Sequence, residues 1–163
     1  MAEAALSGAT HPILENDYAS EWMGIEVLAV SDGHATIRMT LRQEMLNGFG
    51  MAHGGMIFAF ADSAFALACN PVNPTPEEAD NITVAAGVDI NFLKPAYRGQ
   101  MITAVADRRS SSGRSGLYDI QIFAADADAD AQRSPQRDSL PSSGDPGELI
   151  AEFRGRSRTI PKK

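Results

Sequence analysis

The distribution of hydrophobic and polar residues along the chain predicts two strands early in the sequence and four more in its second half. Residues 25–30 and 34–41 are extended segments on either side of Asp32-Gly33, a pair typical of a β-hairpin turn. The later segments are rich in β-branched or aromatic residues and are bounded by Gly, Pro or Ser. They predict strands over residues 82–93, 100–109, 117–125 and 149–160.

Two other segments predict helices. Apolar residues recur at roughly helical spacing within residues 11–22, namely Ile13, Leu14, Tyr18 and Trp22. This spacing indicates a short amphipathic helix. Residues 54–70 carry Ala, Met, Phe and Leu on all sides, so we expect a helix that is buried on nearly every face. A polar loop with several prolines follows it.

The order of these elements is helix, hairpin, long buried helix and four strands. Because strands and helices do not alternate, the order argues against a parallel doubly wound sheet, and we expect an α+β fold. The expected architecture is one curved antiparallel sheet wrapped around one long central helix. We expect a single domain over residues 11–160, preceded by a disordered tail at residues 1–10.

Residues 126–148 differ in composition from their surroundings. Ala, Ser, Pro, Gly and Asp dominate this stretch, and six acidic residues against two arginines give it a charge of −4. Such a composition buries too little apolar surface to become ordered, so we expect a flexible acidic insertion. It could serve as an arm that binds a partner, or it could be a tolerated surface insertion.

Composition and charge exclude several classes of protein. The whole chain has 14 basic and 21 acidic residues and a net charge of −7, which argues against nucleic acid or an anionic membrane as partner. The single cysteine, Cys69, excludes an internal disulfide and a cysteine-rich metal site. We therefore expect a cytoplasmic protein without a bound metal. We expect no secretory signal, because residues 1–10 lack a basic region followed by an apolar run. We expect no membrane span, because Asp62 interrupts the longest apolar stretch.

The candidate chemistry lies between residues 46 and 70. Asp62 is the only charged side chain in the predicted buried helix, where it could act as a base or nucleophile or hydrogen-bond a neighbouring loop. Gly54 and Gly55 at the start of that helix could donate backbone N–H groups to a polarised carbonyl, or could simply permit a tight turn. His53 could be a general base or could cap the helix, and we favour the cap. Asn47 could donate its amide to a carbonyl, or could be a turn residue.

The spacing of Gly54 and Asp62 restricts how they can cooperate. Eight residues along one helix separate them by about 12 Å, so one reacting group cannot reach both within a single chain. If both act on one substrate, Asp62 must come from a second copy of the protein. The simplest arrangement is a symmetric dimer with shared sites.

Several other side chains are candidates for binding a substrate. Phe58 and Phe65 of the predicted helix, with Met56, could line a pocket. Arginines cluster at 108, 109 and 114 and again at 154, 156 and 158, where the alternation of a strand places the last three on one face. They could bind phosphate groups, or they could form solvated surfaces. Of these we select Arg114, Arg156 and Arg158. Cys69 is expected to be a buried, inert thiol.

The run Leu46-Asn47-Gly48, His53-Gly54-Gly55, Asp62 and Asn70 closely resembles the hotdog-fold acyl-CoA thioesterases of the phenylacetate-degradation (PaaI) type. Two later runs, VDINFLKPAYRG and GLYDIQIF with FRGRSR, are also similar to that family. The resemblance covers about residues 11–160, apart from the insertion. The resemblance implies the hotdog fold, homodimers with shared active sites and a tetramer formed as a dimer of dimers.

The resemblance also implies hydrolysis of an acyl-CoA thioester, with an arylacetyl group such as phenylacetyl or a hydroxylated derivative. Coenzyme A is then part of the substrate, and no separate cofactor is expected. Asp62 matches the family's helix carboxylate, as nucleophile or as base for water, and Gly54 matches its carbonyl-polarising amide. Asn47 and His53 match the family's loop asparagine and preceding histidine. Some relatives place a serine on the following strand, where this chain offers only Thr83.

Two alternative functions stay open. A hotdog module that binds acyl-CoA without catalysis is one, although the presence of Asp62 argues against it. A hotdog dehydratase or hydratase is the other, and His53 would then be expected to act as its base.

Overall fold

The computed structural model describes residues 11–127 and 145–163. Its first half contains helix α1 (Tyr18–Met23), strands β1 (Glu26–Ser31) and β2 (His34–Thr40) and helix α2 (Gly54–Cys69). Its second half contains helix α3 (Pro76–Ala79) and strands β3 (Asn81–Phe92), β4 (Met101–Ser112), β5 (Ser115–Ala125) and β6 (Glu148–Pro161). The tail at residues 1–10 and most of the insertion at residues 126–148 lie outside the described residues, so both remain predictions from sequence.

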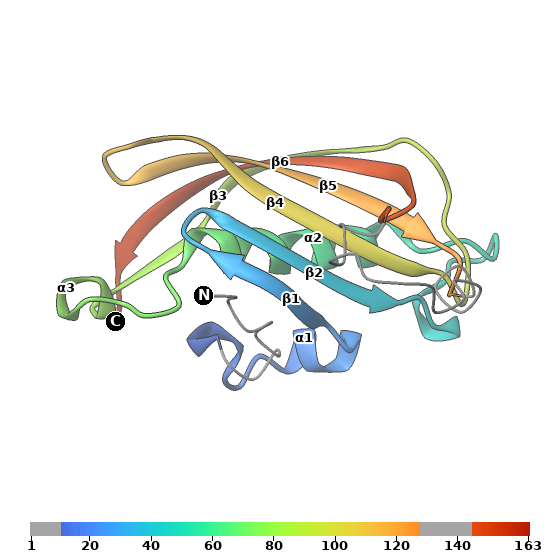
Figure 1. Cartoon of the computed structure of the whole chain (residues 1–163), viewed down its shortest axis with the longest axis horizontal. Coiled ribbons are helices and arrows are strands. Elements are labelled where there is room, and N and C mark those ends of the chain that lie inside the picture. The colour runs from blue at the N-terminus through green and yellow to red at the C-terminus, as the bar shows by residue number, and fades with distance from the viewer. Residues whose placement is uncertain (1–10, 128–144) are drawn as a thin grey trace, which may run out of the picture.

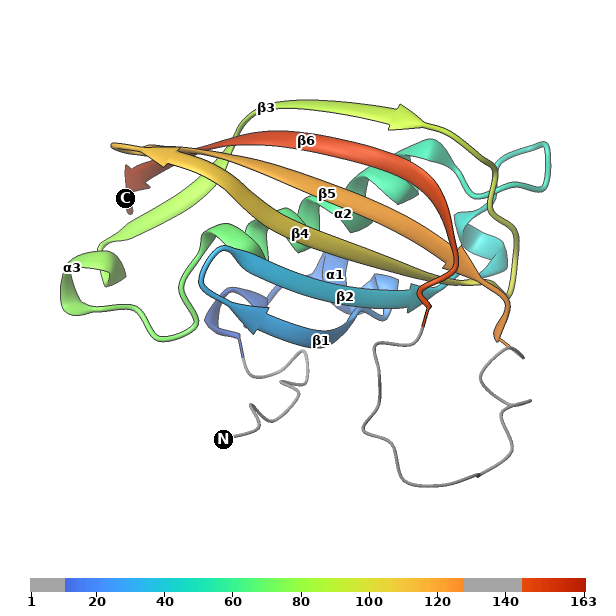
Figure 2. The same cartoon turned by 45° about the horizontal axis from the view of Figure 1, so that its top comes forward.

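The six strands form one antiparallel sheet in the order β1-β2-β4-β5-β6-β3. The sheet curves over α2, which runs along its concave side (Figure 1). Figure 2 shows β1 and β3 at the two edges of this sheet. The predicted α+β architecture and all six predicted strands are therefore confirmed, with boundaries that shift by a few residues.

The hairpin between β1 and β2 forms at the predicted turn. Gly33 adopts a φ of 73°, which is a conformation that glycine tolerates better than any other residue. A Cβ atom at Gly33 would also lie 2.9 Å from Cζ of Arg108. The Asp-Gly pair thus fixes the register of β1 against β2, in which Ser31 pairs with His34.

The core lies between the concave face of the sheet and α2. Inner-facing residues of β2, β4 and β5 are fully buried against the helix, among them Ile37, Ile102, Ala104, Ile120 and Ile122. From α2, Phe60, Ala64, Phe65 and Leu67 are also buried. Among the described residues, none of the helices has both the length and the apolar character that a membrane crossing requires.

One face of α2 is open, so burial on nearly every side is wrong for a single chain. Gly55 and Phe58 are exposed on this face, and Asp62 is half-buried. The neighbouring edge strand β3 is also exposed along most of its 12 residues. A long edge strand whose only charged residue is Asp89, beside an open apolar helix face, is unusual for a monomer, because it leaves both hydrogen-bonding groups and apolar area in water.

The single helix predicted over residues 11–22 is wrong. A 3-10 helix at Pro12–Leu14 and α1 replace it, because Asn16 takes a positive φ of 62° between them. Asp17 then caps α1 by accepting a hydrogen bond from the N–H of Ser20 at 3.0 Å. Tyr18 remains exposed, so the expected apolar face is only partly formed.

The polar loop that follows α2 contains a helix that the sequence prediction omitted. Thr75 and Glu78 form a capping box around α3, in which each side chain binds the other residue's backbone N–H. The spacing Thr-x-x-Glu after two prolines is a recognisable signal for such a helix start.

Candidate active site

His53 organises the start of α2. Its Nδ1 atom accepts a hydrogen bond from the backbone N–H of Gly55 at 3.0 Å, which makes it the N-cap of the helix. A Cβ atom at Gly55 would lie only 3.2 Å from this nitrogen, so glycine leaves room for the capping imidazole. The cap that we favoured for His53 is therefore present.

The adjacent N–H of Gly54 is a free donor. Within the described residues it makes no hydrogen bond, although it stands at the positive end of the α2 dipole. A Cβ atom at Gly54 would lie 3.1 Å from the ring of Phe92, so any side chain here would crowd the approach to this group. An unpaired N–H at a helix N-terminus can stabilise a developing oxyanion.

Asn47 is held by the loop that precedes α2. Its Oδ1 atom accepts hydrogen bonds from the backbone N–H groups of Phe49 at 2.9 Å and Met51 at 3.2 Å. Two donors on one oxygen fix the orientation of the amide, since an inverted amide would face them with its own donors. The Oδ1 atom of Asn47 thus stabilises the turn, whereas its Nδ2 group makes no hydrogen bond within the described part of the chain and could still donate to a carbonyl.

Asp62 lies in the middle of α2, on the open face. Burial raises the pKa of its carboxyl group above the ordinary value of 3.8. Among the described residues no cation forms an ion pair with it, and no hydrogen-bond donor contacts it. The predicted alternative, a carboxylate that binds a neighbouring loop, has no support in these contacts. A half-buried carboxylate without a partner is suited to act as a base or a nucleophile.

Gly54 and Asp62 do not meet in one chain. They lie two turns apart on the straight helix α2, at about 12 Å by the rise of an α-helix. His53, Gly54 and Asn47 gather at the N-terminal end of α2, whereas Asp62 stands alone at its middle. The arrangement therefore provides an oxyanion donor and a carboxylate that could share one substrate only across two copies.

The two predicted phenylalanines have different surroundings. Phe58 is 37% exposed, with its ring centroid 5.5 Å from that of Phe153. Phe65 is only 1% exposed and packs edge-on against Tyr118, with centroids 5.3 Å apart. Phe65 is therefore a core residue, and its predicted role in binding substrate is wrong, because the helix periodicity turns it toward the sheet.

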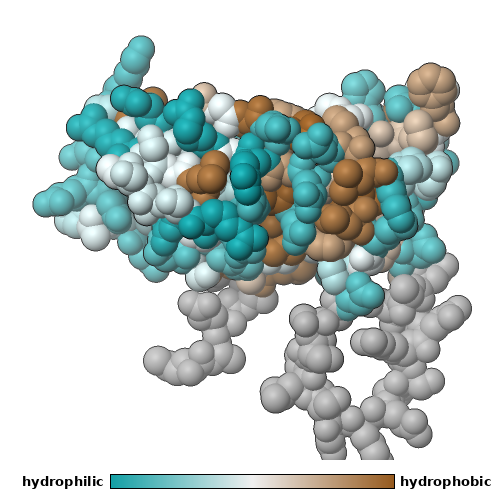
Figure 3. Space-filling model, turned by 90° about the horizontal axis from the view of Figure 1, so that it is seen from above, coloured by the Kyte–Doolittle hydropathy of each residue, from teal (hydrophilic) through white to brown (hydrophobic). Residues whose placement is uncertain are grey.

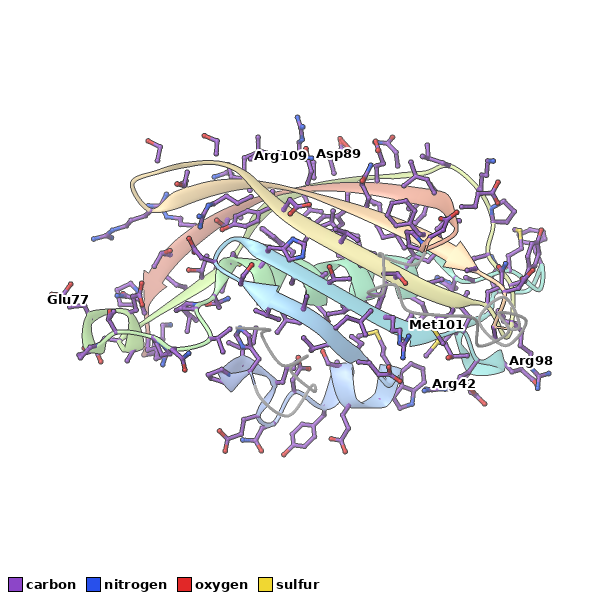
Figure 4. All side chains as sticks on the ribbon, in the orientation of Figure 1. Arg42, Glu77, Asp89, Arg98, Met101 and Arg109 are labelled. Atoms are coloured by element: carbon purple, nitrogen blue, oxygen red, sulfur yellow. The ribbon has the colours of Figure 1, made fainter. Side chains whose placement is uncertain are left out.

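The structure separates the six clustered arginines into two groups. Arg108 makes a bidentate pair with Asp32 at 3.1 and 2.8 Å, and Arg109 and Arg154 share Asp119 at 2.8 and 2.7 Å. The three that we selected, Arg114, Arg156 and Arg158, form no ion pair within the described residues. Figure 4 shows Arg109 and Asp89 on the convex side of the sheet, away from α2.

The hydroxyl of Thr83, on the strand after α2, has a hydrogen-bond partner. The Oγ1 atom of Thr83 lies 2.8 Å from that of Thr159, so the two hydroxyls pair. Asn70 donates to the carbonyls of Ala66 and Thr83, which gives this residue of the motif a structural role at the end of α2. Burial raises the pKa of the Cys69 thiol to about 12, in agreement with an inert cysteine.

Two features escaped the sequence prediction. One is the open face of α2, which the uniform apolar composition of that helix conceals. The other is a cavity of about 1030 Å³ beyond the C-terminal end of α2, which forms from segments far apart in the sequence. No group of three or more potential metal ligands occurs in the described ranges 11–127 and 145–163.

The chain has clear relatives among known proteins. Residues 49–130 match the model of the thioesterase superfamily. The acyl-coenzyme A thioesterase PaaI of Escherichia coli is 38% identical over 112 residues, which cover 69% of this chain and 75% of that protein. The 1,4-dihydroxy-2-naphthoyl-CoA hydrolase of Listeria monocytogenes is 25% identical over 103 residues, covering 63% of this chain and 79% of the relative.

Solved structures agree with these relatives. The structure of Escherichia coli PaaI, from the phenylacetic acid degradation operon, superimposes with a TM-score of 0.69 at 32% identity. It covers 91% of this chain, and this chain covers 88% of it. A variant of the phenylacetic acid degradation protein PaaI from Thermus thermophilus gives a TM-score of 0.67 at 27% identity, covering 87% of this chain and 98% of that one.

Proposed function

This chain belongs to the thioesterase superfamily and has its hotdog fold, and we propose that it hydrolyses acyl-CoA thioesters to a free acid and CoA. The observation that carries this proposal is Asp62, an unpaired half-buried carboxylate on an apolar helix that begins with the free N–H of Gly54. A thioester needs a donor for its carbonyl oxygen and a group that attacks or activates water. Gly54 and Asp62 supply these two parts.

In the proposed reaction the thioester oxygen accepts a hydrogen bond from the N–H of Gly54. Asp62 of a second copy either attacks the carbonyl carbon or takes a proton from a water that attacks it. The C–S bond breaks, the sulfur leaves as a thiolate, and a proton supplied by the water ends on it. In the first route a second step hydrolyses the acyl-aspartate anhydride with water. Both routes give the same acid and the same free CoA thiol.

We propose a homodimer as the active unit, because one chain cannot bring Gly54 and Asp62 to the same carbonyl. The exposed edge of β3 and the open face of α2 lie next to each other and are available for a second copy. A pair of such edges would extend the sheet across a twofold axis and cover Phe58. The shared site would then lie between the two helices.

We further propose a dimer of dimers. Figure 3 shows the convex face of the sheet, where hydrophobic residues gather in one region beside a strongly hydrophilic one. Outward-facing apolar residues of β4 and β5, such as Val105 and Phe123, are half-buried within a single chain. A contiguous apolar patch on a sheet face suits contact with a second dimer.

The proposed substrate carries an arylacetyl group, such as phenylacetyl or a hydroxylated derivative. Aromatic side chains surround the N-terminal end of α2, with Phe58 37%, Phe92 53% and Tyr97 50% exposed in the single chain. The name of the E. coli relative, an acyl-CoA thioesterase encoded in a phenylacetic acid degradation operon, supports the same class. Arg114, Arg156 and Arg158 are the proposed contacts for the phosphates of CoA, and no separate cofactor is required. A cytoplasmic location remains a prediction from sequence.

The test is CoA release from phenylacetyl-CoA, followed with a thiol reagent. We expect Asp62→Asn to lower kcat by roughly 100-fold or more, because it removes the base or nucleophile. The matched control is Asp80→Asn, which changes an exposed carboxylate outside the site and should leave kcat within about twofold. An Asp62→Asn enzyme with nearly the wild-type rate would reject this function for the site.

A further inference from the structure

Asp62 has no hydrogen-bond donor in its own copy to orient it. Within the described residues no donor and no cation contacts its carboxylate, which lies on the open face of α2. Reacting groups have to be held within about 0.5 Å of their productive geometry, which hydrogen bonds to the reacting side chain commonly ensure. The placement of Asp62 therefore depends on how α2 itself is held.

Helix α1 contacts α2 beside Asp62. The Oγ atom of Ser20 on α1 lies 3.1 Å from the Oγ atom of Ser63, the residue that follows Asp62. In the part of the chain that the structure describes, this is the one hydrogen bond between the side chains of α1 and α2. Figure 1 shows α1 at the β1 edge of the sheet. The sheet thus holds α2 along its length, and a second element that does not belong to the sheet holds it at Ser63.

A carboxylate sets the direction of this hydrogen bond. The Oδ1 atom of Asp17 accepts from the N–H of Ser20 at 3.0 Å, and its Oδ2 atom accepts from the hydroxyl of Ser20 at 2.7 Å. Because a hydroxyl has only one proton, Ser20 accepts the hydrogen bond that Ser63 donates. A chain of hydrogen bonds therefore runs from Ser63 through Ser20 to Asp17. Hydrogen bonds to an ionised carboxylate are the stronger kind, so the chain has one fixed orientation.

The burial of Ser20 shows what this chain adds to the contact between the helices. Ser20 is 4% exposed, and together with Met23 it forms the buried face of α1. Alanine would fill the same space without the cost of burying a hydroxyl. Met23 supplies an apolar contact, which permits sliding, whereas the serine pair supplies a directional one. A directional contact restricts the rotation of α2 about its own axis.

Rotation of α2 would displace Asp62 directly. An α-helix with its side chains has a radius of about 5–6 Å, so a rotation of about 10° moves a side-chain tip by about 1 Å. A displacement of about 1 Å in an active site can cost about 100-fold in rate. While Ser63 is bound to α1, the neighbouring Asp62 keeps a fixed direction toward the thioester that Gly54 of the second copy holds.

Resting on the proposed thioesterase activity, we propose that Ser63 is a positioning residue, which acts through Ser20 and Asp17 to fix the direction of Asp62. Ser63 does not touch the substrate in this role, and its hydroxyl proton stays in the chain of hydrogen bonds. Loss of the hydroxyl therefore lowers kcat and leaves KM nearly unchanged, because the contacts that bind the substrate remain.

A matched pair of substitutions at position 63 tests this role. Ser63→Thr keeps the hydroxyl, whereas Ser63→Val has nearly the same shape as Ser63→Thr without it. We expect Ser63→Val to lower kcat for phenylacetyl-CoA about tenfold with KM within about twofold, and Ser63→Thr to keep kcat within about threefold of the wild type. The control Ser112→Ala changes an exposed serine at the end of β4 and should alter neither constant.

A double-mutant cycle tests whether Ser63 acts through Ser20. Ser20→Ala leaves the backbone N–H of residue 20 on Asp17, so α1 keeps its cap. We expect Ser20→Ala and Ser63→Ala each to lower kcat about tenfold. The double variant should lower it no further, because each change breaks the same link. Melting curves of the same samples show that each variant is folded at the assay temperature, and if Ser63→Val is not, kcat of Ser20→Ala decides.

A folded Ser63→Val enzyme with the wild-type kcat would overturn the proposal, because the hydroxyl would then serve stability alone. Equal losses of kcat in Ser63→Thr and Ser63→Val would overturn it as well, and so would losses that multiply in the double variant. In each of these cases the wild-type protein still releases CoA. A wild-type protein that releases none would instead reject the proposed function and, with it, the role of Ser63.

Discussion

The Nδ1 atom of His53 accepts a hydrogen bond from the N–H of Gly55 at 3.0 Å. One imidazole nitrogen is thereby committed to the helix, which limits His53 as a general base. The same contact satisfies one of the first N–H groups of α2 and leaves that of Gly54 free. Helix capping and oxyanion binding are thus divided between neighbouring residues.

The capping role predicts how substitutions of His53 behave. We expect His53→Ala to lower the free energy of unfolding by about 1 kcal/mol and to reduce kcat modestly, because the start of α2 loosens. His53→Asn should recover both properties, since asparagine is a good N-cap residue. Thermal unfolding and CoA release on the same samples provide the measurement. If His53→Asn were folded but inactive, the histidine would be a base, as a dehydratase or hydratase requires.

The environment of Asp62 predicts a pH-dependent gain in stability when it is replaced. Burial raises the pKa of its carboxyl group in the folded state, so the fold favours the protonated form. Its stabilising contribution is complete below the unfolded value of about 3.8 and is lost as the pH rises through the raised folded value. At neutral pH, Asp62→Asn should therefore increase the melting temperature while it abolishes activity.

Melting curves of the wild type and of Asp62→Asn at a series of pH values, from about pH 3 to about pH 8, check this prediction. This range runs from below the ordinary pKa of the carboxyl group to above neutral pH. The difference in melting temperature should be largest at neutral pH and should shrink toward acid. A variant that is less stable than the wild type at neutral pH would show that the carboxylate has a stabilising partner.

Phe58 and Phe65, two of the three phenylalanines of α2, predict opposite phenotypes. Phe65→Ala should lower the free energy of unfolding by about 3–5 kcal/mol, because it opens a cavity between Tyr118 and Phe153. Phe58→Ala should cost less than about 2 kcal/mol in the isolated fold, since that ring is already 37% exposed. Its main effect should be a higher KM for arylacetyl esters than for linear acyl esters. Denaturant unfolding and a substrate panel distinguish the two; a loss of aryl preference in Phe65→Ala alone would contradict this division.

Most of the fold could be predicted from the sequence because its local signals agree with one another. The Asp32-Gly33 turn, the β-rich segments and the uniform apolar character of residues 54–70 each point to the observed element. The prediction of one helix over residues 11–22 failed because the helical spacing of apolar residues carries no information about Asn16. The positive φ of Asn16 separates the 3-10 helix at Pro12–Leu14 from α1. At this point the backbone conformation of one residue, and not the spacing of the apolar residues, determines where the helix begins.

The candidate site was only partly predictable. The motif identified Asn47, His53, Gly54 and Asp62, but the hydrogen bond of His53 was needed to show that it caps the helix. Phe65 could not be separated from Phe58, because which face of an all-apolar helix meets the sheet depends on tertiary packing. The sequence also could not say which clustered arginines are free to bind a ligand. The structure shows that Arg108 is paired with Asp32, and that Arg109 and Arg154 are paired with Asp119.

The central claim is that one active site combines Gly54 of one copy with Asp62 of another. Two inactive variants, Asp62→Ala and Gly54→Val, test this claim when they are co-expressed with different tags and purified as mixed assemblies. The valine side chain at position 54 would crowd Phe92 and block the free N–H. A mixed dimer of these variants contains one intact site. The control pairs wild type with a chain that carries both substitutions, because its mixed dimer then contains no intact site.

The measurement is the rate of phenylacetyl-CoA hydrolysis by the two mixed assemblies. The account predicts that the first pair recovers up to about half of the wild-type rate, while the control pair stays near the background of the inactive chains. The reverse result, an active control pair and an inactive first pair, would place the whole site within one chain and contradict the account.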